Sequence, residues 1–204
     1  LPLSRGNLPR PMSPGRTKQG INMLQLSNQA RPAIVAMAKA LPKASARNYA
    51  TVIGIRNGKA CITDGFGLLA YKIPGESPID ATVTRDLFPS EVKFPQWEML
   101  MPTTGQKVSV EALEEFLELV NAMGTKEVKN VYVALAGDKP WVFKSRIGAP
   151  KSDATAFNPW IAKAFLKALP KGIKVTSGLI DDGKLMINFD GYSLLLVAVL
   201  INPK

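Results

Sequence analysis

The chain has 204 residues, 46% of them hydrophobic, and its 26 lysines and arginines outnumber 16 aspartates and glutamates to give a formal charge of +10. This length and hydrophobicity allow one large core or two small ones and exclude a disordered tail. A protein this basic usually binds nucleic acid or an anionic membrane. The alternative is that its positive charge serves no polyanionic partner. There is no histidine and one cysteine, Cys61, which excludes histidine-based triads, most zinc sites and an internal disulfide.

Residues 1–21 predict a flexible basic arm, with Arg5, Arg10, Arg16, Lys18 and four prolines but no acidic residue in the first 20 positions. A remnant of processing or cloning is the alternative. The longest apolar run, residues 194–201, is far shorter than the ~18 residues that a membrane span needs. We therefore expect a protein without a membrane segment, in a reducing compartment such as the cytoplasm.

Three segments have the apolar spacing of amphipathic helices: residues 28–41, 109–123 and 158–169. Ser27 or Asn28, Ser109 and Asn158 are expected as their N-caps. Pro32 and Pro159 fit the first helical turn, where a missing N–H costs little.

Strands are predicted between the helices. A short strand at residues 22–27 precedes the first helix, and hairpins are expected at residues 50–56 with 59–73, 128–136 with 141–145, and 173–180 with 184–189, followed by a last strand at 193–201. The proline-rich residues 75–107 predict a connector with one possible strand at 81–84 and a helical turn near 85–88.

The predicted order is helix then hairpin, three times, and residues 37–43 (MAKALPK) resemble residues 165–171 (FLKALPK). A repeated unit of this kind predicts an α+β fold in which each helix packs on one face of an antiparallel sheet. An ordinary α+β domain with accidental likeness is the alternative.

Three segments follow one another along the chain: residues 61–70 (CITDGFGLLA), 93–102 and 156–169. In this order they resemble the bacterial DNA sliding clamp, the beta subunit of DNA polymerase III. Residues 61–70 are similar to the Thr-Asp-Gly-His-Arg-Leu motif of its middle domain. Residues 93–102 (KFPQWEMLMP) are similar to the Phe-Pro linker that leads to its last domain, and residues 156–169 to its final helix, which opens with Phe-Asn. An apolar strand and the basic tail Pro203-Lys204 then end the chain, as in that family.

The resemblance implies repeated helix-plus-antiparallel-hairpin half-domains, with a first clamp-like domain at residues 22–92, a linker at 93–103 and a second clamp-like domain at 104–204. It also implies no catalysis, cofactor or metal, and an apolar pocket for peptides from DNA polymerases and other clamp-binding proteins. Carried over by position, the pocket would be lined by Thr63, Gly65, Phe66, Gly67, Leu68, Pro95, Met99, Leu100, Val197, Val199 and Leu200.

Two features depart from the family. Phe66-Gly67 replaces its His-Arg pair, which removes a charge and shifts the expected peptide preference toward apolar contacts. The chain is also about half as long as the bacterial clamp, so that a first domain and one half-domain equivalent are absent or shrunken.

Clamps surround double-stranded DNA and contact its phosphates without regard to sequence. The resemblance implies that the basic residues of the first and third helices face DNA: Arg31, Lys39, Lys43, Arg47, Lys163, Lys167, Lys171 and Lys174. The second helix instead carries Glu111, Glu114, Glu115 and Glu118. Ring closure would need a homo-oligomer of four chains, or three if residues 85–88 add a helix; a clamp-like monomer without a ring is the rival.

Three other functions stay open. An enzyme could use Asp64, Asp181 or Asp182, but these residues lie at predicted turns, where aspartate is favoured for backbone reasons. A plain nucleic-acid-binding module could stack bases on Trp97, Trp141 and Trp160. A structural subunit could keep the clamp fold without DNA.

Overall fold

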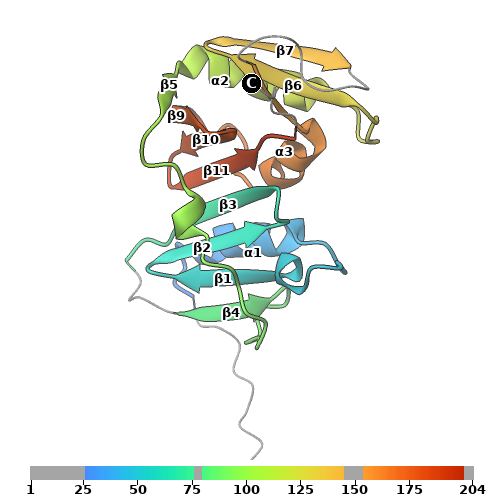
Figure 1. The fold of residues 1–204 in the computed structure, drawn as a ribbon. Coiled ribbons are helices and arrows are strands. Elements are labelled where there is room, and N and C mark those ends of the chain that lie inside the picture. The colour runs from blue at the N-terminus through green and yellow to red at the C-terminus, as the bar shows by residue number, and fades with distance from the viewer. Residues whose placement is uncertain (1–25, 76–79, 145–153, 200–204) are drawn as a thin grey trace, which may run out of the picture.

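The structure, a computed structural model, describes residues 26–75, 80–144 and 154–199 (Figure 1). Outside these residues lie the predicted basic arm, residues 22–25 of the predicted strand at 22–27, and Leu200. Residues 26–27, which are described, do not form a strand.

An antiparallel sheet of eight strands runs through most of the molecule, in the order β4-β1-β2-β3-β11-β10-β9-β5. A second sheet has the order β7-β6-β8. The strands are β1 Val52–Arg56, β2 Lys59–Thr63, β3 Gly67–Lys72, β4 Ala81–Thr84, β5 Gln106–Val108, β6 Val131–Ala136, β7 Lys139–Lys144, β8 Thr155–Phe157, β9 Val175–Asp181, β10 Lys184–Phe189 and β11 Tyr192–Val197. Pairing of β3 with β11 joins the N-terminal strands to the C-terminal ones, so the large sheet crosses both predicted domains.

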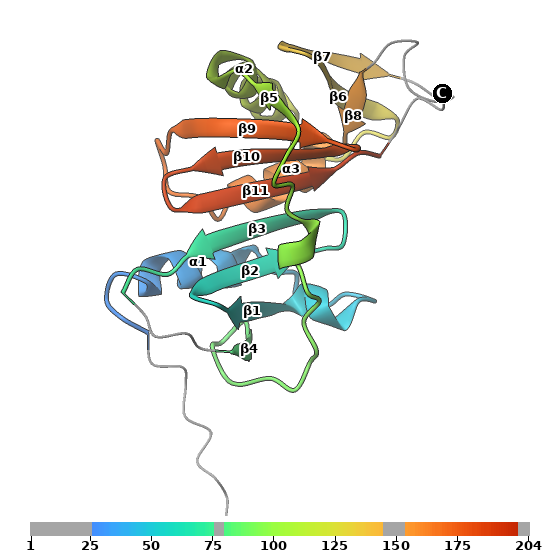
Figure 2. The same cartoon turned by 60° about the vertical axis from the view of Figure 1, so that its left-hand side comes forward.

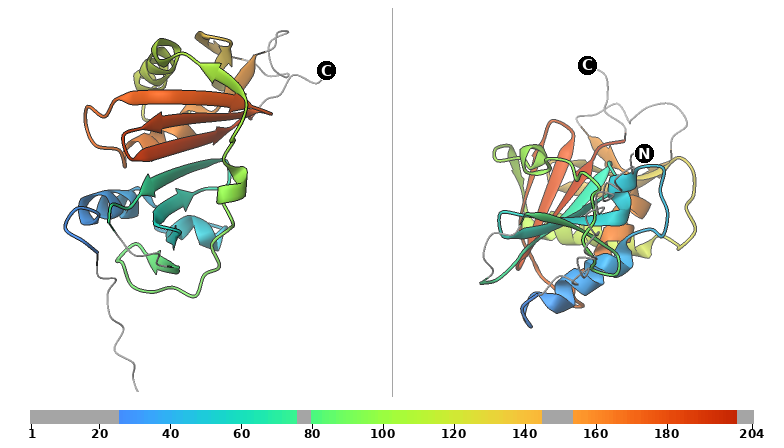
Figure 3. Two further views of the ribbon diagram at one scale, coloured as in Figure 1. Left: turned by 90° about the vertical axis from the view of Figure 1, so that its left-hand side faces the viewer. Right: turned by 90° about the horizontal axis from the view of Figure 1, so that it is seen from below.

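The helices α1 Arg31–Ala40, α2 Val110–Ala122 and α3 Pro159–Leu166 lie on one face of the large sheet (Figure 2). Both α2 and α3 also contact the second sheet. Two short 3-10 helices, η1 Asn48–Thr51 and η2 Glu98–Leu100, lie in the connections, and the segment that contains η2 crosses the opposite face of the large sheet (Figure 3). None of the helices in the described part of the chain is long and apolar enough to cross a membrane.

Local sequence explains where the helices begin and end. The Ser109 hydroxyl accepts the N–H of Ala112 at 3.2 Å, and the Asn158 side-chain oxygen accepts the N–H of Trp160 at 2.9 Å, so these two predicted N-caps are confirmed. The N-cap predicted at Ser27 or Asn28 is wrong, because α1 has Ala30 at this position, without a side-chain bond. Helix α1 starts at Arg31, later than predicted, because residues 28–30 form a turn. Helix α3 ends at Leu166, earlier than predicted, because the N–H groups of Ala168 and Leu169 donate to carbonyls three residues back, at 2.9 Å and 3.1 Å, rather than four.

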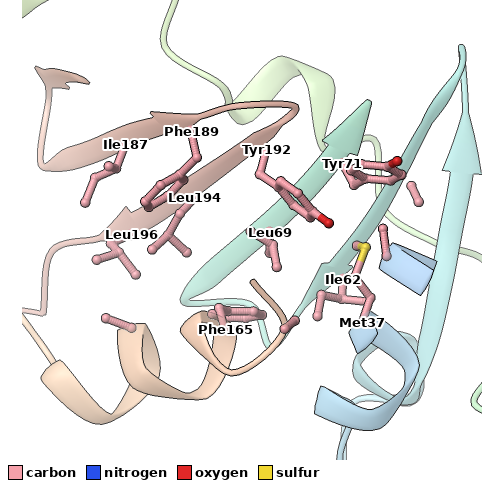
Figure 4. Close-up of a cluster of buried hydrophobic side chains, with 14 of the residues drawn as sticks. Met37, Ile62, Leu69, Tyr71, Phe165, Ile187, Phe189, Tyr192, Leu194 and Leu196 are labelled. Carbon is pink, nitrogen blue, oxygen red and sulfur yellow. The ribbon is translucent and has the colours of Figure 1, made fainter. Parts of the chain in front are cut away.

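The main core lies between the helices and the large sheet (Figure 4). Alternate residues of each strand point into it, as Leu194 and Leu196 do from β11, and the α3 side chain of Phe165 packs against them. The rings of Tyr71 and Tyr192, on neighbouring strands, lie 4.7 Å apart between centroids. The alternation in sequence thus leaves the other set of side chains, such as Ser193 and Leu195, on the opposite face of the sheet.

The repeat of helix and hairpin is confirmed, as is the strand at 81–84, and three details differ from the prediction. Residues 59–73 form two strands, because a loop at residues 64–66 interrupts them. Residues 85–88 form a turn with Leu87 at a φ of 64°, a conformation outside the right-handed helical region, so no helix forms there. Strands β5 and β8 were not predicted, since three residues are too few to show alternation.

The outer edge of β4 is paired with the turn that follows it. The N–H of Thr84 donates to the carbonyl of Phe88 at 2.8 Å, and the N–H of Ser90 donates to the carbonyl of Thr82 at 2.7 Å. Pro89 bridges Val83 between these bonds and has no N–H to offer. This end of the large sheet is therefore covered by the chain itself.

Candidate functional site

A loop of three residues, 64–66, connects β2 to β3. The Asp64 carboxylate accepts the N–H groups of Phe66 and Gly67, both at 2.8 Å. The Thr63 hydroxyl donates to the Gly67 carbonyl at 2.6 Å and accepts the N–H of Gly65 at 3.0 Å. Short polar side chains replace backbone partners in tight turns, and Gly65 tolerates its φ of 90°. The Thr-Asp-Gly sequence therefore fixes the position of the Phe66 ring at the end of the two strands.

Arg47, the residue before η1, packs onto this loop. Its Nη1 donates to the carbonyl of Asp64 at 2.7 Å, and its guanidinium carbon lies 4.6 Å from the centroid of the Phe66 ring. A Cβ on Gly65 would collide with this guanidinium and would lie 2.9 Å from the Tyr49 hydroxyl. The cation thus occupies the space that glycine leaves, and it stacks on the ring that the loop presents.

The linker, residues 93–103, lies on a row of small residues across the large sheet. The register places Gly54 opposite Cys61 and Cys61 opposite Ala70 on the face that the helices do not cover. The Phe94 ring occupies the space that a Cβ on Gly54 would need. Trp97, only 1% exposed, packs in a cluster with Cys61, Ala70 and Leu195. Larger side chains in this row would lift the linker from the sheet.

The end of β11 is tied to the same loop. The N–H of Val197 donates to the carbonyl of Phe66 at 2.9 Å, and Leu195 pairs with Leu68 in the register of β11 and β3. Beyond the strand, the N–H of Val199 donates to the carbonyl of Ala156 at 2.9 Å, which turns the chain toward the second sheet.

These three segments surround a cavity of about 210 Å³. It is lined by Tyr49, Thr63, Gly65, Phe66, Gly67, Leu68, Pro95, Trp97, Leu100, Leu195 and Val197. The apolar side chains of Phe66, Leu100 and Val197 are 48%, 45% and 37% exposed, so the cavity opens to solvent between uncovered hydrophobic groups. An apolar concavity with few polar groups is the usual form of a site for an apolar ligand.

The structure brings together most of the predicted pocket residues, with exceptions. Met99 and Val199 are 80% and 42% exposed and do not line the cavity, and Leu200 lies outside the described residues. Tyr49, Trp97 and Leu195 line it without having been predicted. Leu195 could have been found from the sequence, because it precedes Val197 by two residues and so shares its face of the strand.

The thiol beside the cavity is not a nucleophile. Cys61 is fully buried, and burial, with a smaller contribution from the negative charge of Glu98, raises the pKa of its thiol well above the usual value. The thiolate is the reactive form of cysteine, so this side chain acts as a small apolar residue under the linker. Within residues 26–75, 80–144 and 154–199 no three histidine, cysteine or acidic side chains are grouped to hold a metal ion.

The predicted DNA-facing residues divide into two groups. Six are exposed cations, on or near α1 and α3, whose side chains form no hydrogen bond or ion pair with any described residue: Arg31, Lys39, Lys43, Lys167, Lys171 and Lys174. The other two have partners within the chain. Arg47 packs on the loop, and Lys163 donates from Nζ to the carbonyls of Asn121, at 3.1 Å, and Met123 at the end of α2. The four glutamates predicted on the second helix are all exposed on α2.

No protein-family model and no curated protein sequence matches the chain. Solved structures do. The DNA polymerase III beta subunit of Pseudomonas aeruginosa superposes with a TM-score of 0.58 at 13% identity, covering 95% of this chain and 70% of that one. The beta subunit of Thermotoga maritima gives 0.55 at 16% identity over 93% and 70% of the two chains. The Helicobacter pylori beta clamp bound to a DNA ligase peptide gives 0.58 at 11% identity over 83% and 63%.

The likeness extends over almost the whole described chain but over only part of each neighbour, and the identities are too low to carry more than the fold. It agrees with the motif order in the sequence and with the sheet that joins the two halves of the molecule. The chain therefore has the fold of the bacterial DNA sliding clamps, the beta subunits of DNA polymerase III, in a strongly diverged form.

Proposed function

We propose that the protein is a divergent sliding clamp, a polymerase processivity factor that binds partner proteins through short apolar peptides and contacts duplex DNA. The observation that carries the proposal is the cavity between the 64–66 loop, the linker and the end of β11, with Phe66, Leu100 and Val197 uncovered around it. One structural neighbour, the clamp of Helicobacter pylori, was solved with a DNA ligase peptide bound.

The apolar lining of the cavity indicates which ligands it would bind. Its walls are aromatic and aliphatic, and Phe66-Gly67 stands where the resembling family has a His-Arg pair. A ligand therefore gains affinity mainly by burying leucine-like or phenylalanine-like anchors, at roughly 25 cal/mol per Å² of apolar surface. The proposed partners are DNA polymerases and other DNA enzymes that carry such a peptide, and the protein binds them without catalysing a reaction.

Peptide binding is tested with two neighbouring residues of η2. A fluorescently labelled peptide with adjacent leucine and phenylalanine anchors is titrated with protein, and anisotropy gives the Kd. Leu100→Asp places a charge in the cavity wall and is expected to weaken binding more than tenfold, because a buried unpaired carboxylate is costly. Met99→Asp is the matched control, since Met99 is exposed outside the cavity. Equal affinity of the Leu100→Asp variant and the unmodified protein would contradict the proposed pocket.

The DNA surface is proposed on the helix-covered side, at the six unpartnered cations of α1, α3 and the adjoining turns. Binding through phosphates falls steeply with salt, with a slope near −0.9 per neutralised phosphate. Lys39→Glu and Lys167→Glu are expected to weaken binding to a 20-base-pair duplex of any sequence and to flatten the salt slope. Glu111→Gln on α2 is the control for a change of charge elsewhere. A duplex affinity unchanged by both lysine variants would remove the DNA surface from the proposal.

The assembly we propose is a homo-oligomeric ring, because a chain with these few helices cannot surround DNA alone. The second candidate is a clamp-fold subunit that binds peptides without forming a ring, and two observations favour it: the self-covered edge of β4 and the exposed glutamates of α2, which repel phosphate. Light scattering coupled to size-exclusion chromatography decides between them. A strict monomer at micromolar concentration excludes the ring and leaves the peptide site.

A further inference from the structure

Two lysines stand directly opposite each other on the linker-covered face of the large sheet. The register pairs Lys59 of β2 with Lys72 of β3, and Arg56 of β1 with Lys59. Like charges opposite one another on neighbouring strands destabilise a sheet. An anion beside such a row, from the chain itself or from a ligand, lowers this repulsion.

Only one end of this row is neutralised. Arg56 lies 3.6 Å from an Asp80 carboxylate oxygen and 4.0 Å from one of Glu98. The Lys59 side chain reaches only the Trp97 ring among the described residues, with its Nζ 5.8 Å from the centroid. The Lys72 ammonium group forms no ion pair or hydrogen bond with any described residue. Both lysines are exposed. Neither ammonium group therefore lies within ion-pair distance of a described carboxylate.

The two lysines line a cavity of about 370 Å³ that has a polar floor. The Ser193 hydroxyl donates to Asn188 Oδ1 at 2.8 Å, and Asn188 Nδ2 donates to Ser177 Oγ at 3.0 Å. This chain of bonds has one direction, so the hydroxyl hydrogen of Ser177 and the second N–H of Asn188 remain available to donate. The cavity thus offers two ammonium groups and two further donors, and the Trp97 and Met101 side chains form an apolar wall.

We propose that this cavity is a second binding site, which takes acidic side chains of the same partner peptide that fills the apolar pocket. The inference rests on the proposed peptide-binding function. Donors and cations without a compensating carboxylate suit a carboxylate ligand, and an apolar wall suits the methylene groups of glutamate. The volume is more than ten times the ~30 Å³ of a water molecule, which is ample for one or two side chains.

Location favours a peptide over nucleic acid as the source of the anion. The cavity lies on the face of the sheet opposite α1 and α3, whereas the unpartnered cations proposed to meet DNA lie on the helix side. Trp97 lines both this cavity and the apolar pocket. Leu68 in the pocket and Lys72 are four residues apart on β3 and point to the same face, which corresponds to about 13 Å. A peptide whose acidic residues lie four or five positions from its apolar anchor spans that distance.

The test compares two labelled peptides with the same apolar anchors. One carries two glutamates four and five positions from the nearest anchor, on either side, and the other carries glutamines there. We expect the glutamate peptide to bind about fivefold more tightly at low salt, as for two exposed ion pairs, and the gain to fade at high salt. The double variant Lys59→Gln, Lys72→Gln should abolish the gain. The matched control Lys93→Gln, Lys107→Gln removes the same charge from exposed lysines outside the cavity and should keep it.

Each outcome distinguishes the proposed acidic site from the proposed apolar pocket. Equal affinity for the two peptides, with a loss of both in Leu100→Asp, overturns the acidic site and leaves the apolar pocket. A glutamate gain that depends on the two lysines but not on Leu100 supports the acidic site and refutes the pocket. Absence of binding by either peptide refutes both. A fall in affinity for a 20-base-pair duplex in the Lys59→Gln, Lys72→Gln variant, with no change for the glutamate peptide, overturns the proposal in favour of nucleic acid.

Discussion

Replacing Arg47 by methionine distinguishes between two roles of this cation: contact with DNA phosphates, and support of the 64–66 loop at the cavity. Methionine keeps an unbranched apolar stem of similar reach but removes the bond from Nη1 to the Asp64 carbonyl, at 2.7 Å, and the charge above the Phe66 ring. Both contacts hold the loop that forms one wall of the cavity. We therefore expect Arg47→Met to weaken binding of the apolar peptide and to leave duplex DNA binding unchanged.

The size of the effect follows from the two contacts. A cation–π contact at an exposed position contributes about 0.5–1 kcal/mol, and a hydrogen bond contributes about 1 kcal/mol net. Their sum, about 1.5–2 kcal/mol, sets a ceiling of roughly tenfold to thirtyfold on the loss of peptide affinity. Arg47→Lys keeps the charge but not the planar group that both stacks and donates, so it should recover only a small part.

Fluorescence anisotropy with the apolar peptide and with a duplex measures the two affinities on the same protein. Lys39→Met is the matched control, because Lys39 is an exposed cation of α1 with no partner among the described residues. It should show the reverse pattern, with weaker duplex binding and unchanged peptide binding. The reasoning is refuted if Arg47→Met lowers duplex affinity as much as Lys39→Met and leaves the peptide affinity unchanged.

Three further predictions concern stability and reactivity. Gly67→Ala should lower the free energy of unfolding, measured in urea, by about 1–3 kcal/mol, because its Cβ would lie 2.6 Å from Phe165 and 2.9 Å from Ile161. Gly124→Ala, with open space around it, should be nearly neutral. Equal losses of stability in the two variants would contradict the packing around Gly67. Cys61 should react with a thiol reagent only at the rate of unfolding, and rapid labelling of the folded protein would contradict its burial. Burial, and then the neighbouring Tyr71, raise the pKa of Tyr192 to about 12. As pH rises, the unfolded chain loses this proton first, so the free energy of unfolding should fall between about pH 10 and 12. The fall should be smaller in Tyr192→Phe, and identical pH profiles of the two proteins would refute the assignment.

The elements that could be predicted are those whose signals are local. Ser109 and Asn158 act as helix caps through atoms two or three residues away, and Asn57-Gly58 forms a hairpin turn through its own positive φ angles. The loop at Asp64, which separates β2 from β3, also depends on local contacts. It was not predicted as a break, because the apolar residues on both sides of it favour one continuous strand. Strands β5 and β8 depend on partners far along the chain, and three residues do not reveal them.

The candidate site shows the same division. The residues of the 64–66 loop and the linker could be assigned to one pocket because a family resemblance supplied their convergence, which no local pattern contains. The partners of Arg47 and Lys163, 17 and about 40 residues away, arise only from tertiary packing, so both residues resembled free surface cations in the sequence. The pairing of Lys59 with Lys72 required the strand register, which a loop of different length would have changed.

The covered edge of β4 also limits how copies of this chain can join. A head-to-tail assembly needs two different complementary surfaces, whereas a two-fold assembly needs one surface that matches itself. With β4 closed by residues 88–90, β5 is the remaining edge strand of the large sheet in the described part of the chain, so pairing through the edges of this sheet supports two copies but not a circular series. A ring therefore needs a contact other than pairing of the two edges of the large sheet, and the same closure protects the protein from edge-to-edge polymerisation.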